Sequence, residues 1–178
     1  MKLRIYDPVV LAIDIRHRRF GYALFEGHST ILDWGQRVYP AVGDAERALA
    51  QKRLSKLMAV RQPDLIVVRR ERWERALADS NLANPVMAVR SEAEARSIPI
   101  YLIDQDAIRT TFSRFECETR EDIAATLASI FPELLRSLPP KRKPWKAEHP
   151  RMSIFDAVAL GTAFWHAARE HIVVDRRS

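Results

Sequence analysis

Cysteine is nearly absent from this sequence: Cys117 is the only one among 178 residues, so the chain cannot form an internal disulfide. A chain without disulfides suits a reducing compartment, and we predict that the protein is cytoplasmic. A lone cysteine can also serve as a catalytic thiol. The carboxylates of Glu116 and Glu118 flank this one and disfavour its thiolate form, which argues against that role.

Glycine and long apolar runs are also scarce, and both shortages exclude classes of protein. Only five residues are glycine, and no glycine-rich phosphate-binding loop is present, which argues against P-loop and Rossmann nucleotide-binding proteins. No apolar run approaches the roughly 20 residues that span a membrane. The first eight residues carry charge but not the apolar core of a secretion signal. We therefore expect no membrane association.

Basic residues, by contrast, are in excess. The chain has 29 Lys and Arg against 23 Asp and Glu, a net charge of +6, and such a protein attracts polyanions. The positive charge is concentrated in residues 69–75 and in the proline-rich residues 139–151, and each segment contains a tryptophan. The length and the hydrophobic fraction of 47% suit a single domain over residues 1–178, with a frayed tail at 175–178.

Hydrophobic patterning predicts an α/β domain. Runs of β-branched and aromatic residues predict strands at 9–15, 20–25, 30–39, 65–68 and 98–103. Apolar residues at helical spacing predict helices at 44–60, 82–96, 107–112, 120–138 and 154–171. The first two strands form a hairpin, and Gly35 is a candidate bulge in the third. Three antiparallel strands followed by parallel crossovers indicate a mixed five-stranded sheet with helices on both faces, the layout of the ribonuclease H-like fold.

Four stretches of sequence, taken in order, carry a family resemblance. They are LAIDIRHRRFGYALFEG at 11–27, PDLIVV at 63–68, IRTTF and TREDIAATLASIF within 108–131, and FDAVALGTAFWHA at 155–167. Together they resemble the RuvC-type Holliday-junction resolvases, in which an aspartate ends the first strand and Gly-Tyr opens the second. Each motif is short, so the order and spacing of the four carry the inference.

The resemblance implies an activity, a cofactor and partners. Members of that family are homodimeric, magnesium-dependent endonucleases that cut branched DNA. The resemblance therefore implies Mg²⁺ or Mn²⁺ as cofactor, branched DNA as substrate, a role in DNA recombination and repair, and a homodimer paired through the helix that starts near Leu82. Carboxylates in such a site hold two metal ions about 4 Å apart, one generating hydroxide and one stabilising the leaving oxygen.

The match to the family's four acidic positions is partial. Asp14 matches the aspartate of the first strand and Asp156 that of the last helix, and we predict both as catalytic metal ligands. The acid expected after the fourth strand is replaced by Arg69, and Glu71, two residues later, is the substitute third catalytic and metal ligand. The ligand expected one turn before Asp156 is Ser153. The resemblance thus implies a degraded active site.

Each of these residues also has a structural interpretation. Asp14 could cap the turn after its strand, although a carboxylate in an apolar run is costly to bury unless it is paired or binds a metal. Asp156 could simply stabilise the N-terminus of its helix through the helix dipole. However, apolar residues share its helix face, which directs the side chain toward the sheet. Glu71 could form a solvated ion pair. Arg69 could occupy the cation position and abolish metal binding, or it could grip a phosphate.

The two basic segments are the candidate nucleic-acid interface. Arginines in 69–75 could track phosphates while Trp73 stacks on bases, and the resolvases have an aromatic probe in the corresponding loop. Prolines keep 139–151 out of regular structure, so its charges and Trp145 are displayed on an extended loop. A salt-bridged helix start and a solvated connector are the alternatives. The predicted nucleic-acid-binding residues are Arg69, Arg70, Arg72, Trp73, Arg109, Arg120, Lys141, Arg142 and Lys143.

These observations predict a RuvC-like, metal-dependent endonuclease that acts on branched or structured DNA and has an incomplete active site. The alternative is a catalytically inactive ribonuclease H-like protein that binds nucleic acid without cutting it, and a third possibility is a scaffold or interaction protein that keeps only the fold. Cleavage requires a divalent metal site, whereas binding requires only the basic surface. The surroundings of Asp14 and Asp156 therefore discriminate between the two.

Overall fold

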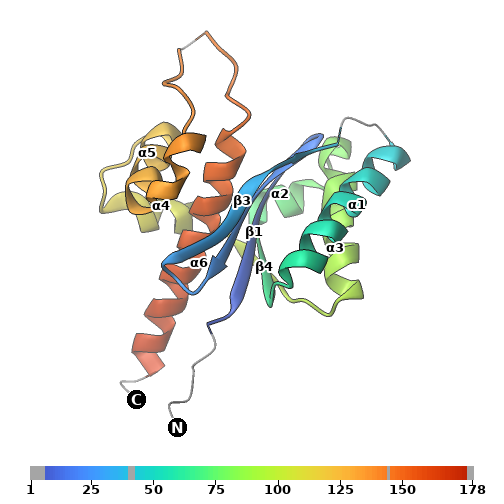
Figure 1. Ribbon diagram of the computed structural model, residues 1–178, viewed down its shortest axis with the longest axis horizontal. Coiled ribbons are helices and arrows are strands. Elements are labelled where there is room, and N and C mark those ends of the chain that lie inside the picture. Colours follow the sequence, from blue (N-terminus) through green and yellow to red (C-terminus); the bar gives the residue numbers. More distant parts are fainter. Residues whose placement is uncertain (1–6, 40–42, 144, 176–178) are drawn as a thin grey trace.

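The computed structural model describes residues 7–39, 43–143 and 145–175, in which a central sheet lies between two layers of helices (Figure 1). The strands are β1 (Val9–Arg16), β2 (Arg19–Glu26), β3 (Thr30–Val38), β4 (Leu65–Arg69) and β5 (Ile100–Ile103). Their order in the sheet is β3-β2-β1-β4-β5; the two pairs among β1, β2 and β3 are antiparallel, and the β1–β4 and β4–β5 pairs are parallel. The predicted mixed five-stranded sheet is confirmed.

Helices cover both faces of this sheet, as predicted. One face carries α1 (Asp44–Arg61) and α3 (Ser80–Ala95); the other carries α4 (Gln105–Ser113), α5 (Arg120–Ile130) and α6 (Met152–Asp175) (Figure 1). In the described ranges no helix has the length and apolar character needed to cross a membrane. Residues 1–6 and 176–178 lie outside the described residues. They include most of the N-terminal segment 1–8 and of the predicted frayed tail 175–178.

The central strand β1 is buried on both faces, which explains its almost continuous apolar sequence. Leu11 and Ile13 pack in the core beneath α1 and α3, whereas Val10 and Ala12 pack in the core beneath α6. Side chains alternate along a strand, so Asp14 points to the same side as Val10 and Ala12. This alternation thus directs the carboxylate of Asp14 into the layer between the sheet and α6.

The start of α6 lies directly against β2 at Gly21. A Cβ atom at this position would overlap the carbonyl oxygen of Ser153 and lie 2.9 Å from the amide nitrogen of Ile154. Gly21 is also the residue paired with Asp14 across the β1–β2 ladder. The absence of a side chain here lets the second turn of α6, which carries Asp156, approach the end of β1.

Two helical segments differ most from the prediction. Residues 70–75, for which no helix or strand is predicted, form a short helix, α2 (Arg70–Arg75), directly after β4. The predicted helix at 120–138 ends at Ile130 as α5, because Pro132 has no N–H to continue the hydrogen-bond ladder. The chain goes on as the 3₁₀ helix η1 (Pro132–Ser137).

The β-bulge of the third strand is not at Gly35, and this prediction is wrong. Leu24 pairs with Asp33 while its neighbour Phe25 pairs with Ile31, so Leu32 is the extra residue. Gly35 lies in regular pairing, where the ring of Tyr22 covers it: a Cβ would sit 3.2 Å from the ring atoms.

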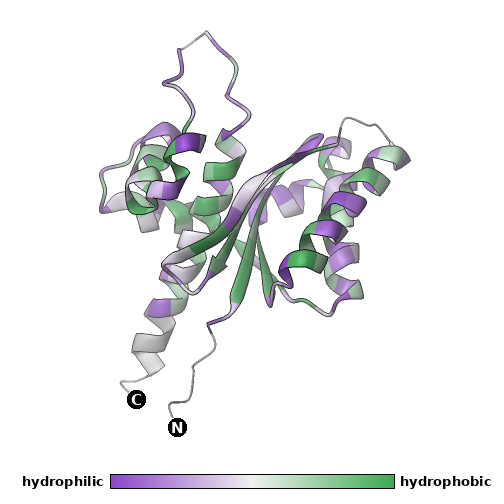
Figure 2. Ribbon diagram, viewed as in Figure 1, coloured by the Kyte–Doolittle hydropathy of each residue, from purple (hydrophilic) through white to green (hydrophobic). Residues whose placement is uncertain are grey.

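The segment 139–151, which we call the basic loop, connects η1 to α6. It extends away from the sheet beyond α5 and α6 (Figure 1), and Figure 2 shows it as largely hydrophilic next to the hydrophobic layers. Its described residues are mostly exposed, but Glu148 and His149 are half-buried near the start of α6. Pro144 lies outside the described residues. The loop therefore returns to the domain through the stretch that includes Glu148.

Candidate functional site

Asp14 and Asp156 lie together between the sheet and α6. Asp14 is fully buried and Asp156 is 5% exposed. Arg16 joins them: its Nε donates to Asp14 Oδ2 at 2.6 Å, and its Nη2 donates to Asp156 Oδ2. The structure thus brings the two acids predicted as metal ligands into one pocket. Since α6 begins at Met152, Asp156 lies beyond the first turn, and the helix dipole does not account for it.

Two further arginines surround Asp156. Arg120, at the start of α5, donates from Nε to Asp156 Oδ1 at 3.1 Å and from Nη2 to Asp156 Oδ2. Arg69, at the end of β4, places its Nη2 at 3.9 Å from Asp156 Oδ1, and its side chain is only 14% exposed. Guanidinium groups therefore approach this carboxylate from three different elements.

Glu148, on the basic loop, closes the arrangement. Its Oε1 accepts from Arg16 Nη1 at 3.0 Å and from Arg120 Nη2 at 2.9 Å, while its Oε2 accepts from Arg120 Nη1 at 2.8 Å. The pair with Arg120 is bidentate, the strongest common form of charge-assisted hydrogen bond. Three positive and three negative side chains thus balance in what we call the arginine–carboxylate cluster: Arg16, Arg69, Arg120, Asp14, Asp156 and Glu148.

Proton affinities within the cluster reflect both burial and this mutual charge. Burial, together with the charge of Asp156, raises the pKa of Asp14, and Arg16 opposes the rise. Burial acts to lower the pKa of Arg16, but Asp14 and Asp156 outweigh it and the pKa is raised. The pKa of Arg120 is raised in the same way by Asp156 and Glu148. For Glu148, partial burial acts to raise the pKa, and hydrogen bonds from Arg120 and the charge of Arg16 lower it overall.

A divalent metal site does not fit these residues. A fully buried carboxylate oxygen without a hydrogen-bond partner, Oδ1 of Asp14, is the kind of atom that a cation would bind. However, the guanidinium of Arg16 already bridges Asp14 and Asp156, and nowhere in the described residues do three His, Cys, Asp or Glu come together to hold a metal. Positive charges a few Å apart repel by about 4 kcal/mol at an effective dielectric of 20, so each nearby arginine disfavours a bound cation.

The structure does not place Glu71 in the cluster. Its Oε1 accepts from the backbone N–H of Gln105 at 2.7 Å and thereby satisfies a free donor at the start of α4. Ser153 is fully buried, and its hydroxyl donates to the carbonyl of Pro150 at 3.0 Å. Glu71, the predicted replacement ligand, therefore binds the start of α4 rather than the cluster. Its other carboxylate oxygen is buried without a described partner.

The short helix α2 positions the remaining residues predicted in segment 69–75. Arg70 pairs with Asp104 at 2.5 Å and with Glu74 at 3.7 Å. Burial lowers the pKa of the half-buried Arg72. Trp73 packs against the core beneath α3, with the guanidinium of Arg90 at 5.4 Å from its ring centre. Segment 69–75 is thus partly tied into the domain.

The basic loop is the more accessible of the two predicted surfaces. Lys141, Arg142 and Lys143 are exposed, and Trp145 is 77% exposed with the ammonium of Lys143 at 5.7 Å from its ring centre. Arg109, the other predicted contact, is exposed on α4 and pairs with Asp106 at 3.5 Å. An exposed aromatic among cations is suited to stacking on unpaired bases.

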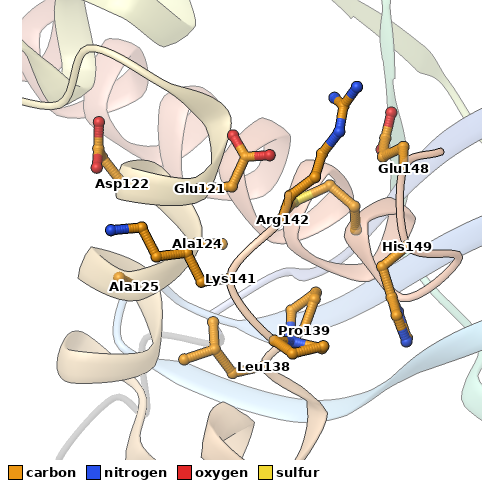
Figure 3. A pocket seen from close by; sticks show the side chains of 12 residues that line it. Glu121, Asp122, Ala124, Ala125, Leu138, Pro139, Lys141, Arg142, Glu148 and His149 are labelled. Atoms are coloured by element: carbon orange, nitrogen blue, oxygen red, sulfur yellow. The ribbon is translucent and has the colours of Figure 1, made fainter. Parts of the chain in front are cut away.

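A cavity of about 270 Å³ separates the basic loop from α5. Ala124, Ala125 and Leu138 form its apolar part (Figure 3). Charged and polar side chains surround it: Glu121 and Asp122 from α5, and Lys141, Arg142, Glu148 and His149 from the loop (Figure 3). Glu148 therefore lies between this cavity and the arginine–carboxylate cluster.

No protein-family model matches the sequence, and no curated protein matches it. The structure is similar to that of RuvC from Thermus thermophilus in complex with a Holliday junction substrate, with a TM-score of 0.67 and 15% identity over 91% of this chain and 96% of that one. The fold is that of a RuvC-like resolvase. A second RuvC structure from the same organism gives a TM-score of 0.66 at 14% identity, covering 92% of this chain and 96% of that one. The yeast mitochondrial Holliday junction resolvase Ydc2 gives 0.50 at 16% identity, covering 95% and 85%.

Two residues of the cluster were missed in the sequence. Arg16 lies two residues after Asp14 on the same strand, so the alternation of side chains places both on one face, and this signal was available. Glu148 is the one acid in the basic loop, but nothing in a loop sequence predicts where its side chain returns. Arg120 was predicted as a DNA contact only, because its partner Asp156 is 36 residues away.

Proposed function

We propose that this RuvC-like protein binds branched DNA and does not cut it by metal-dependent chemistry. The observation that carries the proposal is the arginine–carboxylate cluster, in which Arg16 and Arg120 neutralise the acids that would otherwise hold metal ions. Arg69 adds a third positive charge to the same pocket. Of the functions considered from the sequence, this arrangement favours the catalytically inactive nucleic-acid-binding protein.

Branched DNA is proposed as the ligand on three grounds. The chain has a net charge of +6, and its basic loop displays Lys141, Arg142 and Lys143 together with an exposed tryptophan. The loop emerges beside the cluster, since Glu148 belongs to both. A RuvC of the same fold has been solved in complex with Holliday junction substrate. A role in DNA recombination or repair would follow from such a ligand.

The proposal is tested with a four-way junction and a linear duplex of the same length. We expect preferential junction binding whose affinity falls steeply with salt, by about 10³-fold between 50 and 200 mM if about six phosphates are contacted. We expect no cleavage in Mg²⁺ or Mn²⁺. A titration followed by fluorescence anisotropy, and a denaturing gel of the same samples, measure both properties.

A matched pair of variants locates the binding surface. Replacing Lys141, Arg142 and Lys143 with alanine should weaken junction binding and reduce the salt slope by about 3. Replacing Lys52, Arg53 and Lys56, which are exposed on α1 on the other side of the sheet, removes the same charge and should change binding much less. Equal losses in the two variants, or no junction binding by the wild type, would overturn the proposal.

Metal-dependent endonuclease activity is the second candidate, and the convergence of Asp14 and Asp156 in one pocket is the observation in its favour. Junction cleavage by the wild type that disappears in Asp14→Asn would establish it. Such a result would require Arg16 to leave both carboxylates when metal and DNA bind.

A homodimer is also proposed, because a two-fold DNA junction is matched by a two-fold protein. In this chain Leu82, Val86 and Val89 of α3 pack in the domain's own core, so pairing through α3 would use its outward face, where Met87 is 36% exposed. Sedimentation at micromolar concentration should give about twice the 20.5 kDa chain mass. A single 20.5 kDa species would contradict the dimer and leave DNA binding to be tested by itself.

A further inference from the structure

Glu148 makes the kind of contact with two arginines that a phosphate group makes. Both of its oxygens face the terminal nitrogens of Arg120, at 2.8 and 2.9 Å, and Arg16 Nη1 donates to Oε1 at 3.0 Å. The planar fork of a guanidinium matches carboxylate and phosphate oxygens equally well. Arg16 and Arg120 together therefore form a site for a group with two or more negatively charged oxygens.

Of the three carboxylates in the cluster, Glu148 is the one placed to leave. Its side chain is 25% exposed, against 0% for Asp14 and 8% for Asp156. It lies on a loop rather than on the sheet or α6, and it borders the cavity between that loop and α5 (Figure 3). The side chain can thus turn toward the cavity without displacing packed core residues.

Charge balance defines what would replace it. Without Glu148, the arginine–carboxylate cluster holds three arginines against Asp14 and Asp156, and one phosphodiester with its single negative charge restores neutrality. Arg120 remains accessible to such a ligand, since its side chain is 39% exposed. Lys141 and Arg142 on the rim of the cavity lie beside the route by which a DNA backbone would approach.

We propose that Arg16 and Arg120 form a phosphodiester-binding site that Glu148 occupies in the free protein, and that a backbone phosphate of bound DNA displaces Glu148. This inference rests on the proposed DNA binding. It makes Glu148 a contact that opposes DNA binding, although it lies in the most basic segment of the chain. Displacement also releases the basic loop from its attachment to the cluster.

Glu148→Gln tests the proposal, with Glu121→Gln as the matched control. Glu121 lines the same cavity from α5 but is not part of the arginine–carboxylate cluster, so its replacement makes the same change in net charge. We expect Glu148→Gln to bind the junction about tenfold more tightly than Glu121→Gln, because a charge-assisted contact no longer competes. Its salt slope should equal that of Glu121→Gln, since in both complexes the same phosphate contacts Arg16 and Arg120.

Glu148→Asp provides a second test that leaves the net charge unchanged. The shorter side chain cannot reach both arginines, so junction affinity should again rise above that of the wild type. Inorganic phosphate is the probe that does not depend on DNA: it should raise the melting temperature of Glu148→Gln but not that of Glu121→Gln.

The outcomes separate this inference from the proposed function. If the wild type binds the junction but Glu148→Gln, Glu148→Asp and Glu121→Gln do not differ in affinity, the phosphate site is wrong and DNA binding stands. If no variant binds the junction but phosphate stabilises Glu148→Gln alone, the anion site stands and branched DNA is the wrong ligand. If neither DNA nor phosphate binds, both are wrong.

Discussion

Arg16→Ala should destabilise the protein by about 3 to 5 kcal/mol, the usual cost of removing one partner from a buried ion pair. Arg16 is the cation between Asp14 and Asp156, and its side chain is only 11% exposed. Without it, two carboxylates face each other in the layer beneath α6, one of them fully buried. The free energy of unfolding in urea, compared with that of the wild type at pH 7, measures the loss.

Two companion variants identify the origin of that loss. Arg109→Ala, which removes an exposed ion pair with Asp106, should change stability little. Arg16→Ala combined with Asp14→Asn should recover part of the loss, because the buried site then keeps one charge fewer. Arg16→Ala as stable as the wild type would contradict the charge balance of the cluster.

The loss should also depend on pH. Burial, and then the charge of Asp156, raises the pKa of Asp14, and in Arg16→Ala the opposing charge of Arg16 is gone. An acid whose folded-state pKa exceeds its unfolded value, about 3.9, binds its proton more tightly in the folded state. The destabilisation is therefore complete above the folded-state pKa and disappears as pH falls through that value toward about 4. Urea titrations of Arg16→Ala between pH 7 and 4 should show a shrinking difference from Arg109→Ala.

Gly21→Ala should cost about 3 kcal/mol or prevent folding, at or above the upper end of ordinary overpacking. The new methyl group would meet the carbonyl oxygen of Ser153 and the amide nitrogen of Ile154, and neither backbone atom can rotate away. The start of α6 would have to move off the sheet. Gly35→Ala is the control, because its methyl group would meet the ring of Tyr22 at 3.2 Å, which can yield by a few tenths of an ångström.

The same variant should disturb the site as well as the fold. Gly21 pairs with Asp14, and Asp156 lies one turn beyond Ser153, so a displaced α6 separates the two acids. Thermal unfolding measures the loss of stability, and junction affinity of the folded fraction measures the effect on the cluster. Gly21→Ala and Gly35→Ala with equal melting temperatures would show that α6 does not approach β2 as described.

The sequence predicts the site residues whose direction follows from a periodic strand or helix pattern. It does not predict those whose position depends on the path of the chain outside such patterns. Asp14 could be placed because an apolar strand with alternating faces fixes its direction, and Asp156 because its helix face is apolar. Glu71 could not, since two residues past a strand end the chain either continues extended or turns into a helix, and α2 is a helix. Glu148 depends on the path of a proline-rich loop, for which no pattern in the sequence gives a direction.

The cations of this site are arginine side chains, so every molecule carries them whatever ions the solution contains. Arg16, Arg69 and Arg120 come from β1, β4 and α5, so the chain carries its own counterions into the pocket as it folds. With respect to metal, a pocket of this kind has no loaded and unloaded forms. Chelators and changes in the magnesium concentration should leave the melting temperature unchanged, whereas anions in solution should compete with the carboxylate of Glu148 for the arginines. The anions in the solution, rather than its metal ions, would then determine the state of this site.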